Sequence, residues 1–104
     1  MHMSGSLVNE SLQLTCIPET VTSKAVLSFQ LREESEVVLK ILNSAEETVR
    51  VLLNEKLGSG AYHIPFDALH LPSGNYIAKM FIGTQKEISV RNTSFQIQNT
   101  IPFP

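Results

Sequence analysis

The sequence contains no tryptophan, only one cysteine, and no long apolar run. Its single thiol, Cys16, excludes an internal disulfide and a zinc site built from cysteines alone. No stretch approaches the roughly 18 apolar residues that a membrane-spanning helix needs. Among 104 residues, 8 are lysine or arginine and 10 are aspartate or glutamate. The formal net charge of −2 therefore predicts no basic surface for nucleic acid or an anionic membrane.

The composition changes at both ends of the chain. Residues 1–6 (MHMSGS) have the composition of a cloning remnant and are left out of the fold. Residues 99–104 carry two prolines in their last three positions, and proline prevents strand pairing. We therefore expect one domain over residues 7–98, followed by an extended tail over residues 99–104.

Most of the chain alternates apolar and polar residues with the period of two that is typical of strands with one buried face. Turn residues separate the alternating segments, and the stretch 18–23 is expected to be a break without strand. The alternating segments are 11–17, 24–31, 37–41, 49–53, 61–66, 76–82 and 88–97. This count predicts an all-β, immunoglobulin-like antiparallel β-sandwich of about seven strands. Its expected core consists of Phe29, Leu39, Ile41, Val51, Phe66, Tyr76, Ala78 and Met80.

The last alternating segment changes phase along its length. Ile88 and Val90 occupy even positions, whereas Phe95 and Ile97 occupy odd ones. One extra residue within 91–94 would bring both pairs to the same face, so the pattern predicts a β-bulge there.

The stretch 36–57 also fits a helix. Val38, Leu42, Ala45, Val49 and Leu52 are spaced 4, 3, 4 and 3 residues apart, which is a helical heptad. Six β-branched residues in the same stretch, and a polar break at positions 43–44, favour two strands instead. The residues alone leave both interpretations open.

A pattern across residues 36–83 carries a family resemblance. An apolar strand, a second strand, Gly60, the pair Phe66-Asp67, and a turn with Gly74 before Tyr76 follow one another in order. This order resembles the FlgD-type immunoglobulin-like domain and the type A C-terminal sorting domain of the bacterial type IX secretion system. The resemblance implies that these five residues maintain the fold by turning the chain and filling its core. It implies no catalytic residue, cofactor or metal.

The sequence departs from the family pattern at three places. Ser44 stands in a turn where the family usually has glycine, and Phe66 stands where tryptophan is frequent. Residues 96–104 contain no lysine or arginine, although sorting domains of this kind commonly end with basic residues.

The resemblance implies a non-enzymatic accessory or protein-interaction module of a larger bacterial secreted or cell-envelope protein. Its partner would be a protein: secretion machinery, a domain of the parent protein, or a second copy. Nucleic acid and membrane insertion are not expected, and the location would be secreted or cell-surface, with the periplasm crossed in transit. Two alternatives stay open: a C-terminal sorting or anchoring domain read by the type IX system, and a domain of a flagellar hook-cap-like extracellular assembly.

The residues that could carry chemistry lack the spacing that chemistry requires. His63, His70 and Asp67 lie close together in sequence, but zinc needs three or four converging ligands, and solvent-facing histidines are expected instead. The acidic cluster at residues 33–36 lacks the alternating aspartate, asparagine and glycine pattern of a calcium loop. Cys16 has no cysteine–histidine signature and is expected to be a buried thiol.

Overall fold

A computed structural model describes residues 13–98, and all of their regular structure is β. The expectations for residues 1–6 and 99–104 lie outside the described residues. The eight strands are β1 (Thr15–Ile17), β2 (Thr20–Val21), β3 (Lys24–Leu31), β4 (Ser35–Leu42), β5 (Thr48–Leu57), β6 (Gly60–Asp67), β7 (Gly74–Gly83) and β8 (Ile88–Ile97). Within residues 13–98 there is no helix of the length and apolar character needed to cross a membrane.

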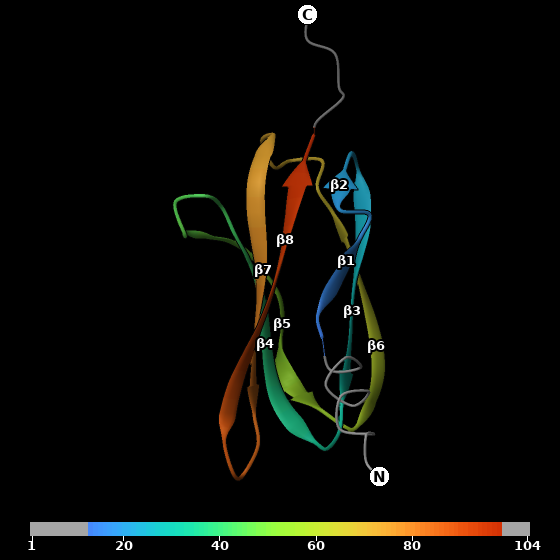
Figure 1. Cartoon of the computed structure of the whole chain (residues 1–104), viewed down its shortest axis with the longest axis vertical. Helices are drawn as coiled ribbons and strands as arrows, with labels where there is room; N and C mark the ends of the chain where they lie inside the picture. Colours follow the sequence, from blue (N-terminus) through green and yellow to red (C-terminus); the bar gives the residue numbers. More distant parts are fainter. Residues whose placement is uncertain (1–12, 99–104) are drawn as a thin grey trace, which may run out of the picture.

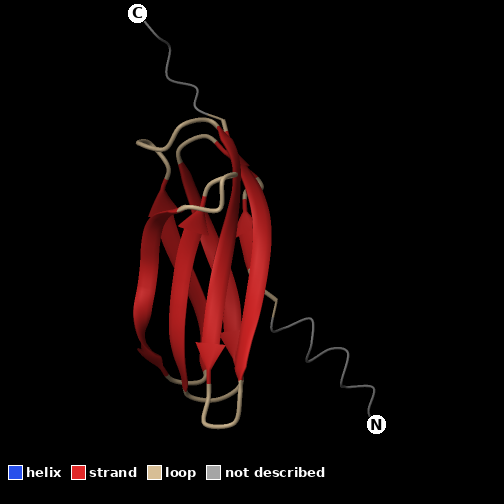
Figure 2. Cartoon of the chain, turned by 90° about the vertical axis from the view of Figure 1, so that its left-hand side faces the viewer, coloured by secondary structure: helices blue, strands red, loops and turns tan. Residues whose placement is uncertain are grey.

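The strands form two sheets that pack face to face. The small sheet has the order β1-β3-β6, and the large sheet has the order β2-β8-β7-β4-β5. Figure 1 shows the two layers side by side, with β3 and β6 on the right and β4 and β7 on the left. In Figure 2 the strands run along the long axis and the loops gather at the two ends. The all-β sandwich predicted from the sequence is therefore confirmed.

The core lies between the sheets and follows the predicted alternation. In β3, Leu27 and Phe29 are buried while their neighbours Val26 and Ser28 are only partly covered. The same alternation runs along β4 and β7, and their inward residues meet those of β3. Fully enclosed side chains from both sheets form the centre of the core: Leu27, Leu39, Ile41, Met80, Val21 and Val37.

The stretch 36–57 forms two antiparallel strands, β4 and β5, so the helical interpretation is wrong. The polar break at residues 43–44 explains why two strands form here and not one helix. The side-chain oxygen of Asn43 accepts hydrogen bonds from the backbone N–H of Ala45 at 2.9 Å and of Glu47 at 3.0 Å. Glu46 takes a positive φ of 64°. These contacts close a tight loop at the point where a helix would have to continue.

The predicted core position of Val51 is wrong, because its side chain is 54% exposed. The register between β4 and β5 shifts twice, and each shift places an extra residue in β5, at Leu52 and at Val49. Val49 and Leu52 pack against the core, whereas Val51 turns outward opposite Lys40. Strict alternation fails in this strand because a bulge changes which face the next residue occupies.

Arg50 of β5 connects the large sheet to the small sheet by a hydrogen bond. Its position opposite the buried Ile41 places its side chain on the inner side of the strand, although strict alternation with a buried Val51 would predict the outer side. The guanidinium donates a hydrogen bond to the backbone carbonyl of Asp67, at the end of β6 in the small sheet. A long cation thereby bridges the two layers at their edge, with its charged end near solvent.

The predicted bulge in the last strand is also wrong. The register between β7 and β8 runs without a shift from Gly74 opposite Ile97 to Gly83 opposite Ile88. Phe95 therefore faces the core, while Ile88 is 76% exposed and Val90 is 43% exposed on the outer face. The phase change in the sequence marks two apolar residues left on the outer face.

The stretch 18–23 contains the short strand β2, which the sequence did not predict. Thr20 and Val21 pair in parallel with Gln96 and Ile97 of β8. This pairing is the one parallel contact among the described strands, so the sandwich is not purely antiparallel. Two residues between turn residues show no periodicity, and only pairing with β8 defines them as a strand.

Candidate protein-binding surface

The five residues of the family-like pattern lie at turns and in the core. Phe66 is buried and its ring centroid is 5.6 Å from that of Phe95. Tyr76 stacks on the same Phe95 ring at 5.9 Å. The carboxylate of Asp67 accepts a hydrogen bond of 2.8 Å from the backbone N–H of Leu69 and so shapes the turn after β6. These contacts are structural, and none of them forms a site for a ligand.

The two glycines of the pattern open strands in the same way. Gly60 begins β6 with φ of 139°, and Gly74 begins β7 with φ of 155°. Two residues later each strand has a tyrosine, Tyr62 or Tyr76. Each tyrosine hydroxyl donates to the backbone carbonyl four residues upstream, that of Gly58 or of Pro72. The recurrence of Gly-x-Tyr is the signal in the sequence for this shared arrangement.

The histidines do not converge with other ligands. His63 lies on the outer face of the small sheet, where its Nδ1 is 2.9 Å from the hydroxyl oxygen of Ser28 on β3. Asp67 is exposed at the end of β6, and His70 is exposed in the turn that follows. Within residues 13–98, no three histidine, cysteine, aspartate or glutamate side chains are grouped so that they could hold a metal ion.

Cys16 lies in the core on β1, as the alternation predicts. Burial raises the pKa of its thiol from 9.0 to about 11, and the nearby charge of Glu19 acts in the same direction. The thiol is therefore protonated at neutral pH. A protonated, enclosed thiol is a poor nucleophile.

The raised pKa of Cys16 predicts a loss of stability at alkaline pH. The unfolded chain loses the thiol proton near pH 9, whereas the folded chain keeps it until about pH 11. The stability due to this pKa difference is therefore complete below pH 9 and is lost as the pH rises to 11. Urea unfolding at both pH values should show a larger loss for the native sequence than for Cys16→Ala. An equal loss in the two proteins would show that the thiol is not shielded.

The outer face of the large sheet carries an apolar band. Val38 of β4 pairs with Phe81 of β7, and Phe81 pairs with Val90 of β8. Ile88 lies two residues from Val90 on the same face, and Val51 of β5 lies opposite Lys40. Of the five large apolar residues that are most exposed in the described part of the chain, three lie here. This group of exposed apolar side chains makes the outer face of the large sheet a candidate interaction surface.

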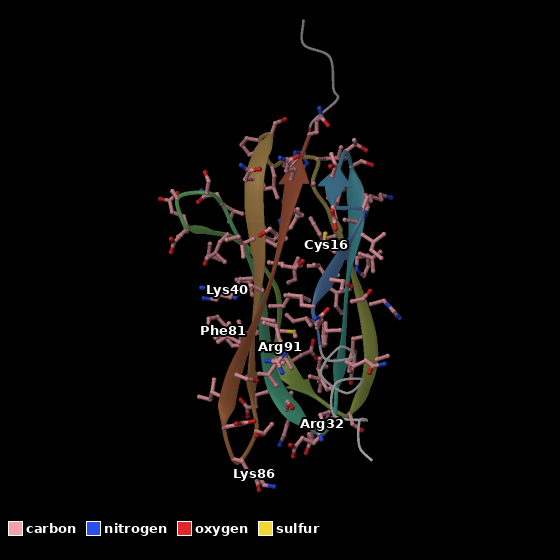
Figure 3. The ribbon with its side chains drawn as sticks, viewed as in Figure 1. Cys16, Arg32, Lys40, Phe81, Lys86 and Arg91 are labelled. Carbon is pink, nitrogen blue, oxygen red and sulfur yellow. The ribbon has the colours of Figure 1, made fainter. Side chains whose placement is uncertain are left out.

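Two lysines lie within this band. Lys40 of β4 and Lys79 of β7 are direct cross-strand partners, although like charges opposite one another are unfavourable. The ammonium of Lys40 lies 5.5 Å from the centroid of the Phe81 ring, a cation–π contact that partly offsets this repulsion. Figure 3 shows Lys40 and Phe81 on the outer side of the large sheet. An acidic group of a partner would neutralise the pair.

A second, smaller apolar patch lies on the outer face of the small sheet. Ile17, Val26 and Pro65 are in register across β1, β3 and β6. Ile17 is 67% exposed, and the patch borders a shallow hollow. No lysine pair accompanies this patch, so the outer face of the large sheet is the stronger candidate.

The chain was compared with family models, curated proteins and solved structures. No family model, no curated protein and no solved structure matches the chain.

Proposed function

We propose that this chain is a non-enzymatic protein-interaction module of a larger bacterial secreted or cell-envelope protein. The observation that carries the proposal is the apolar band on the outer face of the large sheet, with Lys40 and Lys79 inside it. Interfaces combine a partly apolar centre with polar groups that fix orientation, and this face offers both. The stiff sandwich beneath it would hold a bound partner at a fixed angle to the rest of the parent protein.

The secreted or cell-surface location rests on the sequence resemblance to FlgD-type and type IX sorting domains. The resemblance assigns fold-keeping roles to five residues, which lie at turns and in the core: Gly60, Phe66, Asp67, Gly74 and Tyr76. Their placement bears on the fold, and the location rests on the sequence resemblance alone. The sorting-domain and hook-cap alternatives stay predictions.

Site-specific photo-crosslinking in the source bacterium tests the proposal. A photoreactive side chain at Val51 should crosslink the parent protein to a protein partner in the culture or envelope fraction. The same side chain at Ala61, exposed on the small sheet, is the matched control and should not. Replacing Phe81 by serine should remove the Val51 crosslink, because the substitution deletes the aromatic ring of the apolar band. Equal crosslinking at both positions, or a cytoplasmic parent protein, would contradict the proposal.

A further inference from the structure

One edge of the large sheet lacks a described partner over most of a strand. β8 pairs with β7 along its whole length, but on its other side β2 reaches only Gln96 and Ile97. The backbone N–H groups of Gln96 and Gln98 donate to carbonyls of Glu19 and Val21 on that side. Because backbone groups alternate sides in a regular strand, the other even-numbered residues of β8 also point their N–H and C=O groups there.

The backbone groups on this side therefore belong to Ile88, Val90, Asn92 and Ser94, and of these the Val90 carbonyl accepts a hydrogen bond of 3.4 Å from the Arg91 guanidinium. The unbroken register with β7 ensures that this alternation holds along the strand. We call Ile88 to Ser94 the free edge of β8. Within residues 13–98, no other strand pairs with it on that side.

The other edges of the sandwich are protected against pairing. β1 and β2 are only three and two residues long. β5 carries two bulges, and β6 contains Pro65, which cannot donate a ladder hydrogen bond. Bulges, proline and short length are devices by which natural sheets prevent edge pairing. The free edge of β8 has none of these three, and its single charged residue is the inward-facing Arg91.

The side chains beside the free edge differ between its two faces. On the outer face lie Ile88 and Val90, both exposed. On the inner face lies an open pocket lined by three cations, Arg91 of β8, Arg32 and Lys86, together with Glu33 and Glu87. Figure 3 shows Arg91 on the side of β8 that faces the small sheet, with Arg32 and Lys86 toward the same end of the molecule. A strand added at this edge would direct alternate residues to an apolar surface and to a net basic pocket.

We propose that the free edge of β8 binds an extended segment of a partner protein in which apolar and acidic residues alternate. The partner strand would hydrogen-bond to the even-numbered backbone groups, which is strand addition to a sheet edge. Its apolar side chains would pack beside Ile88 and Val90, and its carboxylates would face the pocket that Arg32 and Lys86 line. The inference rests on the proposed function and names the chemistry of the partner.

A second copy of the chain is a poorer occupant. The free edge contains no aspartate or glutamate, so a second β8 supplies no carboxylate for the basic pocket. Antiparallel self-pairing centred on the free edge would place Arg91 opposite its own copy, and like charges in that position are destabilising. An arginine facing inward at an edge strand therefore disfavours self-association and favours an acidic partner.

Peptide titration of the full chain by NMR tests the inference. The probe is a seven-residue peptide that alternates valine and glutamate, and the control peptide has lysine in place of glutamate. We expect shift changes centred on Ile88 to Ser94, and binding of the acidic peptide at least about tenfold tighter than that of the basic one. Arg91→Glu should reverse this preference.

A matched pair of variants tests the backbone contacts. Val90→Pro removes an N–H from the free edge without removing one directed at β7, so binding should be lost while the thermal midpoint is retained. Val90→Thr keeps that N–H and should keep binding. If Val90→Pro unfolds the chain, the charge reversal in Arg91→Glu still decides the question.

Several results would overturn the inference. Absence of binding, or equal binding of both peptides, would show that the edge does not select an acidic strand. Shift changes confined to the outer face around Lys40 and Phe81 would overturn the inference but leave the proposed function in place. Concentration-dependent association through Ile88 to Ser94 in the free chain would identify a second copy as the occupant. Failure of the Val51 crosslink would count against the proposed function alone, because that position is on β5.

Discussion

Replacing Phe95 by alanine should lower the free energy of unfolding by about 3–5 kcal/mol. The Phe95 ring is buried between Phe66 of the small sheet and Tyr76 of the large sheet, with centroids 5.6 Å and 5.9 Å away. Its loss would leave a cavity where the two layers meet and would remove two aromatic contacts. Urea unfolding followed by circular dichroism measures the change.

The matched control for Phe95→Ala is Ile88→Ala in the same strand. Ile88 is 76% exposed, and its truncation should change stability by less than about 0.5 kcal/mol. The pair also tests the unbroken register of β8. With a bulge between the two residues both side chains would face the core, and both variants would be strongly destabilised. Similar losses in the two variants would therefore contradict the register described here.

Replacing Gly74 by alanine should cost about 1–3 kcal/mol, because the residue would be held in a backbone conformation that side chains rarely adopt. Gly74 has φ of 155°, and a Cβ at this position would lie 4.0 Å from the Tyr76 ring, which is ordinary contact. The cost therefore comes from the backbone and not from a clash. Thermal unfolding of the variant measures it.

Gly58→Ala is the control for Gly74→Ala. Gly58 has no positive φ, and an added Cβ would meet no atom within 4 Å. We expect its stability to be unchanged or slightly raised, because alanine reduces the freedom of the unfolded chain. A loss at Gly58 as large as that at Gly74 would show that the strained conformation is not the cause.

The fold class followed from the sequence where burial is one-sided. In β3 and β7 each inward residue is apolar and each strand is regular, so a period of two identifies both the strand and its buried face. The turn at residues 71–75 was equally clear, because proline and glycine limit the backbone conformations available there.

The errors arose where neighbours, and not local sequence, decide the face of a residue. Two bulges in β5 turn Val51 outward, and their positions depend on pairing with β4. Val21 belongs to a strand only because β8 lies beside it. In β8, the apolar character of Ile88 and Val90 predicts the same face as Phe95 and Ile97, but both residues are exposed on the outer face, because apolar character does not guarantee burial.

The candidate binding surface could not be predicted for the same reason. Val38, Phe81 and Val90 come from three strands and meet only through the order of the sheet. The free edge depends on which strand ends beside β8, and that information is absent from β8 itself. The out-of-phase pair Ile88 and Val90 is the one signal for it in the sequence, and the same pattern also predicts a bulge, which the register with β7 excludes.

Among the strands of residues 13–98, none pairs with β8 over residues 88–94 on the side away from β7, and amide hydrogen exchange of the full chain tests this edge most directly. In the free protein, Ser89, Arg91 and Thr93 should exchange slowly because their N–H groups face β7. The amides of Val90 and Asn92 should exchange fast, and should become protected when the acidic peptide is added. Uniformly slow exchange along β8 in the free chain would show that the edge is already paired, and would contradict the claim.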